Sequence, residues 1–434
     1  MKFLVCNYTG FRSNWGSQAT SRGLLRFLSK ILPEGRIPQI DILPYPPTHW
    51  LDHWQSWRYG DSLEAIYATP SPQKAQLDVL ERLTKARFGG LLERVKAADV
   101  VFFQGEGALG TGREFRRTQL FGPLLLAKHR YKKITISINQ SVIFRSADSM
   151  RALQAIFGSL DRNYVRELDS LSTCMSEGWP EFGFIPDAAF FYGAGKTTVP
   201  AFASPYFCIT GSADLASYNL EAYARGIEAV ADRWNLHPVF VYSRNSDAAV
   251  VEAFTRLGNR GFTTITSATH PDVDQLLPVL AGAQVVIGGR YHTSISALSQ
   301  NVPVILTASN SRKSVGLAQM FGAENVPLLD SSSPPAIVAA MENLFEDRAA
   351  LRGRLAARLG ELEQTVRTAA EELKAFLTAR TAQLQESGQA YVPDPALEGR
   401  QRVLDQLRTV SRSQNLRHYD RPKLLQLSPP PAGR

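Results

Sequence analysis

Short apolar segments alternate with segments of helical periodicity along most of the chain. Residues 2–7 are apolar at almost consecutive positions, as in a parallel strand that is buried on both faces. A loop rich in Gly, Ser and Asn follows, and residues 19–32 then carry apolar side chains at helical spacing. This succession of strand, glycine loop and helix is typical of the start of a doubly wound α/β domain.

The alternation continues through the first half of the chain, with further predicted strands at residues 39–43, 99–105 and 132–141. Helical spacing is present at residues 73–98. Residues 44–72 interrupt the pattern, because Pro, Trp and Tyr are frequent there and no period is evident. We therefore expect this segment to be an irregular excursion over the surface.

A second α/β unit follows a cluster of Pro and Gly near residue 193, where a new strand is predicted at residues 205–212. Strands and helices then alternate as in the first half. This pattern predicts an α/β fold of two Rossmann-like domains, at residues 1–192 and 193–334, that face each other across a cleft.

Two segments follow the predicted domains. Residues 335–388 distribute Glu and Arg around Leu and Ala, which predicts a helical segment packed on the body. Residues 389–434 contain a Pro-rich linker, a basic stretch and a Pro-rich end, and are predicted to be a partly disordered tail.

Length and composition exclude several classes of protein. The chain has 434 residues, of which 44% are hydrophobic and 20% charged, so a single small domain and global disorder are both excluded. No run of about 18 apolar residues is present, and the apolar run after Lys2 is too short for a signal peptide. We therefore expect a cytoplasmic protein.

The three cysteines, Cys6, Cys174 and Cys208, are far apart and show no metal-ligand spacing. This argues against a disulfide scaffold and a zinc site, and predicts buried, reduced thiols.

Most of the net charge of +8 lies in the tail, since residues 400–434 contain eight basic and two acidic side chains. The rest of the chain is nearly neutral, which argues against nucleic acid as a partner. The basic tail is typical either of a solvated extension or of peripheral contact with an anionic surface, here the inner membrane.

Four segments with glycine or polar residues follow predicted strands, where open parallel sheets bind ligands. Each also has a purely structural interpretation: the glycine loops are common in plain turns, and an arginine followed by acidic residues is common on solvated faces. The four segments are Asn14–Ser17, Gly105–Gly107, Arg166–Glu167 and Gly288–His292.

The last of these segments is the most specific. A buried strand ends in Gly289, Arg290 and His292 follow it, and Thr293 or Ser294 is able to cap the next helix. A cation, an imidazole and a helix N-terminus then converge on one anion-sized volume. This arrangement suits a phosphorylated or carboxylated substrate, and a structural arginine is the alternative.

An aromatic cluster occupies the irregular segment. Its members are typical either of side chains that stack on a sugar or of side chains that pack a loop onto its own domain. They are His49, Trp50, His53, Trp54, Trp57 and Tyr59.

Taken together, the candidate segments resemble the motifs of the polysaccharide pyruvyl transferase family. Each motif is weak alone, but five of them occur in the family's order and approximate spacing over residues 1 to about 325. Ser17 departs from the acidic residue or cysteine of many members, and Lys313 is displaced from a lysine that often follows the last strand. The motifs are Asn14-Trp15-Gly16, Gly105-Glu106-Gly107, R-E-x-x-S at 166–170, P-D-x-A-F at 186–190 and G-x-R-x-H at 288–292.

The resemblance implies a glycosyltransferase-B-like fold and a reaction. By this resemblance, pyruvate from phosphoenolpyruvate is expected to be transferred to two hydroxyls of one sugar in a polysaccharide or glycan precursor, with release of phosphate. The acceptor is expected to be nucleotide- or lipid-linked. The reaction is expected to need neither a metal nor another cofactor, with phosphoenolpyruvate as the donor substrate.

The resemblance also implies roles for residues on the donor side. Arg290 and Arg166 are expected to bind phosphoenolpyruvate, beside Gly289, where the backbone approaches the substrate. His292 is expected to transfer protons or to contact the phosphate.

On the acceptor side, the resemblance implies that Asn14, Gly16 and Glu106 line the cleft. Asp187, which follows Pro186 close to the predicted domain boundary, is expected either to orient an arginine or to cap a turn.

Two other functions remain as alternatives on the sequence alone. One is a nucleotide-sugar glycosyltransferase, because two Rossmann-like domains also suit that chemistry. The other is a non-catalytic binding protein that uses its basic tail.

Overall fold

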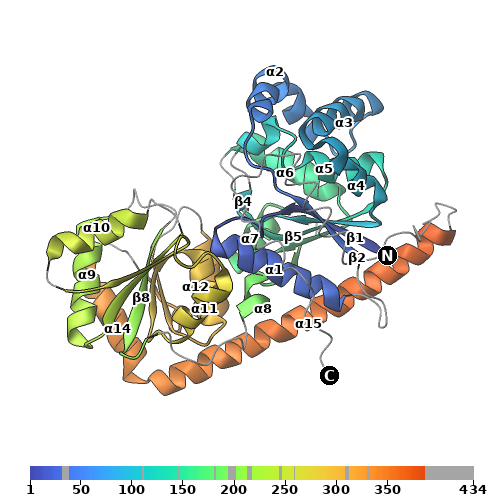
Figure 1. Cartoon of the computed structure of the whole chain (residues 1–434). Helices are drawn as coiled ribbons and strands as arrows, with labels where there is room; N and C mark the ends of the chain where they lie inside the picture. Colours follow the sequence, from blue (N-terminus) through green and yellow to red (C-terminus); the bar gives the residue numbers. More distant parts are fainter. Residues whose placement is uncertain are drawn as a thin grey trace.

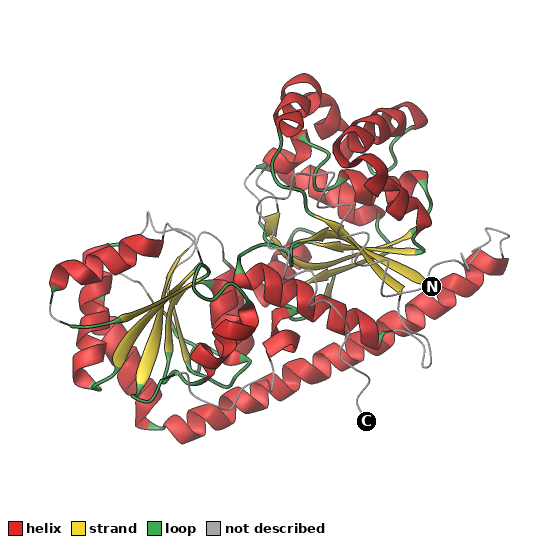
Figure 2. Cartoon of the chain, in the orientation of Figure 1, coloured by secondary structure: helices red, strands yellow, loops and turns green. Residues whose placement is uncertain are grey.

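The computed structural model describes most of the chain, and the predicted tail at residues 389–434 lies outside the described residues. The described part forms two α/β domains, each built on one parallel sheet with helices on both faces (Figures 1 and 2). This confirms the predicted fold class. The described residues are 1–31, 39–109, 112–143, 146–179, 182–193, 202–212, 218–243, 247–258, 260–307, 312–329 and 333–386.

The first sheet has the strand order β2-β1-β3-β5-β6-β7, and β4 pairs with β5. All its pairings are parallel, and β3 is buried along its whole length, which explains its consecutive apolar positions. β5 is also buried throughout, although it alternates apolar and polar residues. The direction of winding changes between β1 and β3, where such sheets bind ligands. The strands are β1 (Lys2–Tyr8), β2 (Gln39–Pro44), β3 (Val100–Gln104), β4 (Ala108–Leu109), β5 (Ile134–Val142), β6 (Arg162–Val165) and β7 (Gly183–Phe184).

Helices and short helical turns connect these strands. They are α1 (Trp15–Lys30), α2 (Trp50–Tyr67), α3 (Lys74–Phe88), η1 (Gly89–Leu92), α4 (Glu93–Ala97), η2 (Arg113–Arg116), α5 (Gly122–Leu125), the π-helical η3 (Leu126–Arg130), α6 (Ala147–Ser159), α7 (Leu168–Ser176) and α8 (Ala189–Gly193).

The second sheet has the order β10-β9-β8-β11-β12-β13, which is the Rossmann order with its change of direction between β8 and β11. Its strands are β8 (Tyr206–Ser212), β9 (His237–Tyr242), β10 (Thr263–Thr266), β11 (Val286–Gly289), β12 (Val304–Thr307) and β13 (Leu328–Leu329). Its helices are α9 (Leu220–Arg233), α10 (Ala248–Leu257), α11 (Val273–Ala281), α12 (Tyr291–Leu298) and α13 (Lys313–Phe321).

The predicted irregular excursion is wrong, because most of it forms helix α2. The His49 imidazole accepts a hydrogen bond from the Leu51 N–H, and Asp52 accepts one from the His49 N–H at 2.8 Å. Asp52 and Gln55 are fully buried, and Asp52 pairs with Arg87 at 2.7 Å. The buried face of α2 is therefore partly polar, so hydrophobic periodicity does not reveal the helix.

The aromatic cluster does not pack as a unit on its own domain. Trp50, Trp54 and Trp57 on α2 are 65%, 38% and 80% exposed. Three indoles of the cluster therefore face solvent, which corrects the packing interpretation for them.

A helix pair forms the C-terminal extension, α14 (Pro334–Glu346) and the 39-residue α15 (Arg348–Glu386). Helix α15 is about 58 Å long at 1.5 Å per residue, and it crosses from the second domain to the first (Figure 1). Leu351 and Leu355 join the core of the second domain, whereas Leu373 and Leu377 join a core of the first.

Among the described residues, no helix is both long and apolar enough to cross a membrane. Cys6, Cys174 and Cys208 are buried and free, as predicted.

Helix α1 joins the two domains. Arg22 on α1 makes a bidentate pair with Asp272 at the start of α11, with both N–O distances at 2.7 Å. The Trp15 indole donates to the carbonyl of His270 at 2.7 Å. These contacts hold the N-terminus of α1 against the second domain.

Candidate active site

Five of the predicted site residues lie together where the domains meet. Each lies near a strand end or a helix start, although they are far apart in sequence. Gly16 is in the first turn of α1, Glu106 follows β3, Arg166 follows β6, Asp187 precedes α8, and His292 is in the first turn of α12.

The His292 imidazole lies against the first turn of α1. A Cβ on Gly16 would be 2.6 Å from both Cβ and Cγ of His292, so only glycine leaves room for this ring. Asn14 caps α1 by accepting the N–H of Ser17 at 3.1 Å, and its amide lies 3.5 Å from Ser243 Oγ. The N-x-G motif therefore shapes a surface against which a residue of the other domain packs.

A buried charge cluster orients His292. Arg166 Nη1 lies 2.8 Å from Asp187 Oδ2, and the same oxygen lies 3.3 Å from His292 Nε2. The other oxygen of Asp187 accepts hydrogen bonds from Thr20 Oγ1 at 2.8 Å and from the Ala189 N–H at 2.9 Å. Asp187 thus does both things that the sequence offered as alternatives: it orients an arginine and it caps a turn.

Arg166 is enclosed by protein. Its residue is fully buried, its Nε donates to Ser141 Oγ, and its Nη2 donates to the Gly107 carbonyl, both at 2.9 Å. Although burial favours the neutral acid, the charges of Arg166 and His292 hold the pKa of Asp187 far below its ordinary value. The geometry favours a positioning role for Arg166, in place of the expected direct contact with phosphoenolpyruvate.

Glu106 lies beside this cluster. Ser17 Oγ donates to its carboxylate at 3.2 Å. Burial opposes ionisation, but the neighbouring charges of His292 and Arg12 hold the pKa of Glu106 below its ordinary value. Glu106 is therefore a carboxylate at neutral pH, able to accept a hydrogen bond from a hydroxyl group.

Arg290 belongs to a second cluster, in the C-terminal domain. Its guanidinium makes a bidentate pair with Asp247, with Nε 2.8 Å from Oδ2, and its side chain is 16% exposed. The strand before it requires glycine, since Gly288 has a φ of +147° and a Cβ there would lie 3.0 Å from the carbonyl carbon of Thr210. Gly289 is buried at the end of β11. The segment 288–292 was predicted to bring Arg290 and His292 to one anion-sized volume. In the structure Arg290 instead pairs with Asp247, whereas His292 belongs to the cluster with Asp187.

Lys313 is a site residue that the motif spacing did not place. It is the first residue of α13, and its charge interacts with those of Glu106, Asp187 and Glu167. Burial, and then the charge of Arg166, lower the pKa of Lys313 from 10.5 to about 7. The signal for Lys313 in the sequence was its resemblance to the lysine that often follows the last strand in the family, although Lys313 is displaced from that position.

Within the described residues, no group of three or more His, Cys, Asp or Glu side chains is arranged to hold a metal ion. The chemistry that the described groups offer is proton transfer by an oriented imidazole, hydroxyl contact by a carboxylate, and anion binding by Arg290 and Lys313.

The chain has a two-domain α/β fold of the glycosyltransferase-B type, and the candidate site lies between the domains. The chain is similar to the S. aureus MnaA–UDP structure, with a TM-score of 0.54 and 13% identity over 87% of this chain and 97% of that one. It is also similar to the UDP-GlcNAc 2-epimerase from Neisseria meningitidis bound to UDP-GlcNAc (TM-score 0.51, 12% identity, 88% and 100% covered). A UDP-forming α,α-trehalose-phosphate synthase from Burkholderia xenovorans gives a TM-score of 0.52 at 11% identity, with 86% and 99% covered.

The chain belongs to the polysaccharide pyruvyl transferase family. The family's model matches residues 14–311, which include all five motifs. A search of curated protein sequences found no match. Family membership makes the protein a transferase that acts on polysaccharides. The resemblance to this family that the sequence motifs indicated is therefore confirmed.

Proposed function

We propose that this protein transfers pyruvate from phosphoenolpyruvate to two hydroxyls of one sugar in a polysaccharide precursor, forming a cyclic ketal and phosphate. Family membership supports this reaction. The observation that carries the proposal is the convergence of Gly16, Glu106, Arg166 and Asp187 around His292 at the domain interface.

The chemistry proceeds by addition and elimination at one carbon. The methylene carbon of phosphoenolpyruvate takes up a proton, and C2 becomes an oxocarbenium-like centre. One hydroxyl attacks C2, the bond from C2 to the phosphate oxygen breaks, and the second hydroxyl then attacks the same carbon. The two protons lost by the hydroxyls balance the proton on the new methyl group and the proton carried by the phosphate.

His292 is the group that transfers protons in this proposal. Asp187 accepts the Nε2–H, because it is an ionised carboxylate 3.3 Å away. Nδ1 is then the nitrogen free to exchange a proton, at the N-terminus of α1. Glu106 receives a hydroxyl of the acceptor.

Arg290 and Lys313 neutralise the donor substrate, which carries both a carboxylate and a phosphate. Arg290 directly precedes α12, whose free N–H groups also favour an anion, and Lys313 begins α13. Arg166 fixes the positions of Asp187 and His292 instead of contacting the substrate.

Lys313 gives the donor site a specific pH dependence. Its pKa of about 7 means that it is charged below this pH and neutral above it, so the affinity for phosphoenolpyruvate is expected to fall as pH rises above 7. Lys313→Met is expected to remove most of this fall, as measured by calorimetric titration from pH 6 to 9. Arg312→Gln is the matched control, because the neighbouring Arg312 is exposed and pairs with Asp169. An identical pH profile in Lys313→Met would exclude Lys313 from the donor site.

The reaction itself is tested by phosphate release from phosphoenolpyruvate in the presence of a panel of nucleotide- and lipid-linked sugars. Release that depends on a sugar, together with a pyruvate ketal in the product, is the expected result. A new glycosidic bond with release of a nucleotide, and no ketal, would establish the glycosyltransferase alternative instead.

We also propose that the acceptor is nucleotide- or lipid-linked and that the basic tail contacts an anionic membrane surface. Each interfacial basic residue contributes about 1 kcal/mol, so binding to anionic vesicles is expected to be weak and to fade with added salt. Vesicle sedimentation compares the full chain with one that ends at Gly399. Equal sedimentation of the two chains would contradict this role of the tail.

A further inference from the structure

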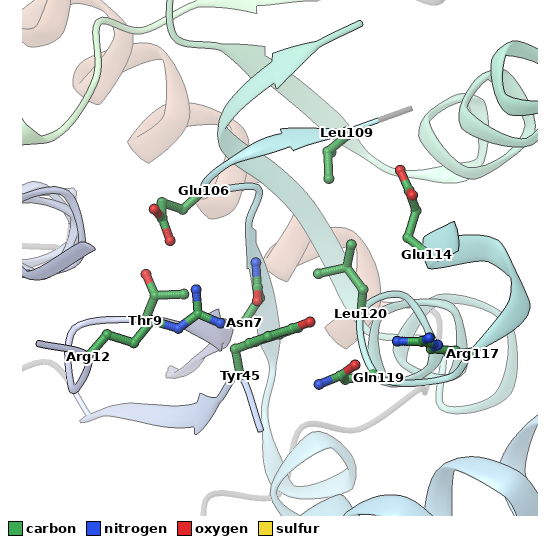
Figure 3. A pocket seen from close by; sticks show the side chains of 10 residues that line it. All are labelled: Asn7, Thr9, Arg12, Tyr45, Glu106, Leu109, Glu114, Arg117, Gln119 and Leu120. Carbon is green, nitrogen blue, oxygen red and sulfur yellow. The ribbon is translucent and has the colours of Figure 1, made fainter. Parts of the chain in front are cut away.

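The N-terminal domain contains a cavity of about 280 Å³ at the edge of its sheet, beside Glu106. It lies where the winding of the sheet changes direction, since Asn7 and Thr9 come from the end of β1 and Glu106 follows β3. The lining residues are Asn7, Thr9, Arg12, Tyr45, Glu106, Leu109, Glu114, Arg117, Gln119 and Leu120 (Figure 3).

Two arginines face this cavity, and among the described residues neither forms a salt bridge with a carboxylate, although the charge of Arg12 also acts on Glu106. Figure 3 shows Arg12 on one side and Arg117 on the other, with Tyr45 between them. Both guanidinium charges act on the Tyr45 phenol, which places them around one volume. Arg12 stacks on the Tyr45 ring at 4.7 Å, and Arg117 Nε is buried with no hydrogen-bond partner among the described residues.

Arg12 and Arg117 are partly buried, and the fully or nearly fully buried arginines of this domain differ from them in being paired. Arg22, Arg87 and Arg166 each pair with an aspartate at 2.7 or 2.8 Å. A buried guanidinium donor without a partner is costly, unless a ligand supplies the acceptor. The unpaired Nε of Arg117, with the second positive charge of Arg12 across the cavity, therefore indicates an anionic group on whatever occupies the cavity.

The remaining lining groups suit sugar hydroxyls. Asn7 and Gln119 bring side-chain amides, and Glu106 and Glu114 bring carboxylates. Gln119 is held in place by its hydrogen bond to the Pro46 carbonyl at 2.6 Å. Pockets for drug-sized ligands measure about 300–1,000 Å³, so this cavity has the size for one small unit such as a single sugar.

We propose that the cavity binds one anionic sugar unit of the acceptor, with its phosphate or carboxylate held between Arg12 and Arg117. The inference rests on the proposed function, because it takes the occupant to be the acceptor. Glu106 belongs both to the cavity and to the surroundings of His292, so a hydroxyl at this end of the sugar lies next to the proton-transferring group. The anionic group at the other end fixes which hydroxyls are presented.

The proposal is tested by calorimetric titration of the full chain, without phosphoenolpyruvate, against glucose 1-phosphate, glucuronic acid, inorganic phosphate and neutral glucose. At least one of the two anionic sugars is expected to bind 10-fold or more tightly than glucose and than inorganic phosphate. Glucose 1-phosphate carries a phosphate and glucuronic acid a carboxylate, so their relative affinities show which of the two anionic groups the cavity binds. Failure of both anionic sugars to bind, or equal binding by neutral glucose or by inorganic phosphate, would overturn the proposal.

Substitutions connect the binding to the cavity. Arg117→Gln is expected to weaken the anionic sugar at least 10-fold, and Arg117→Lys to retain part of the affinity because it keeps the charge. Arg58→Gln is the matched control, since Arg58 is an exposed arginine on α2 outside the cavity. Unchanged affinity in Arg117→Gln would overturn the proposal.

Phosphoenolpyruvate, titrated separately, distinguishes this inference from the proposed function. Its affinity is expected to be the same in Arg117→Gln and in the unmodified protein. Loss of phosphoenolpyruvate affinity in Arg117→Gln would assign the cavity to the donor and overturn the inference. Arg117-dependent binding of an anionic sugar, without phosphate release from any acceptor, would instead preserve the inference and contradict the pyruvyl transfer.

Discussion

Replacement of His292 by glutamine is expected to lower kcat for pyruvyl transfer by about 10²- to 10⁴-fold, the usual contribution of a positioned acid or base. The ring is held by Asp187 at 3.3 Å and by its packing on Gly16, so it is oriented before the substrate binds. Glutamine keeps a polar side chain but cannot exchange a proton. The KM for phosphoenolpyruvate is expected to change much less than kcat, because Arg290 and Lys313 are the groups proposed to neutralise the donor anion.

Steady-state phosphate release with a confirmed acceptor measures this effect. His53→Gln is the matched control, since His53 is exposed on α2 and is expected to retain full activity. Gly16→Ala provides an independent variant, because the added Cβ would displace the His292 ring and is expected to lower kcat without removing the imidazole. A kcat for His292→Gln within threefold of the unmodified protein would reduce this histidine to a packing role.

Replacement of Arg166 by methionine is expected to destabilise the fold by about 3–5 kcal/mol, because it leaves the buried Asp187 without its counter-charge. Both side chains are fully buried and lie 2.8 Å apart. Urea denaturation of the full chain measures the loss in the free energy of unfolding.

Two comparisons show whether the unpaired charge is the cause. Arg312→Met removes a pair whose arginine is 71% exposed, and is expected to cost no more than about 1 kcal/mol. Asp187→Asn in the Arg166→Met background removes the remaining charge and is expected to restore part of the stability. A loss below 1 kcal/mol in Arg166→Met would mean that the pair contributes little to folding.

The sequence alone determined that the chain forms two α/β units, and where most of their strands lie. Strands such as β3 and β12 are buried on both faces, so their apolar positions are consecutive and mark them plainly. The helix pair at the C-terminus was also predictable from its charge and periodicity. Helix α2 was not, because its buried face includes Asp52 and Gln55 and three of its indoles are exposed.

The sequence also named the motifs that meet at the interface, because a parallel sheet brings the carboxyl ends of its strands to one edge. Which side chains touch was decided only by the tertiary structure. Arg166 and Asp187 form a buried salt bridge, and Arg290 pairs with Asp247. The charge of Lys313 interacts with charged residues of the other domain. These relations depend on distances of a few ångströms between segments far apart in the chain, and no local pattern encodes such distances.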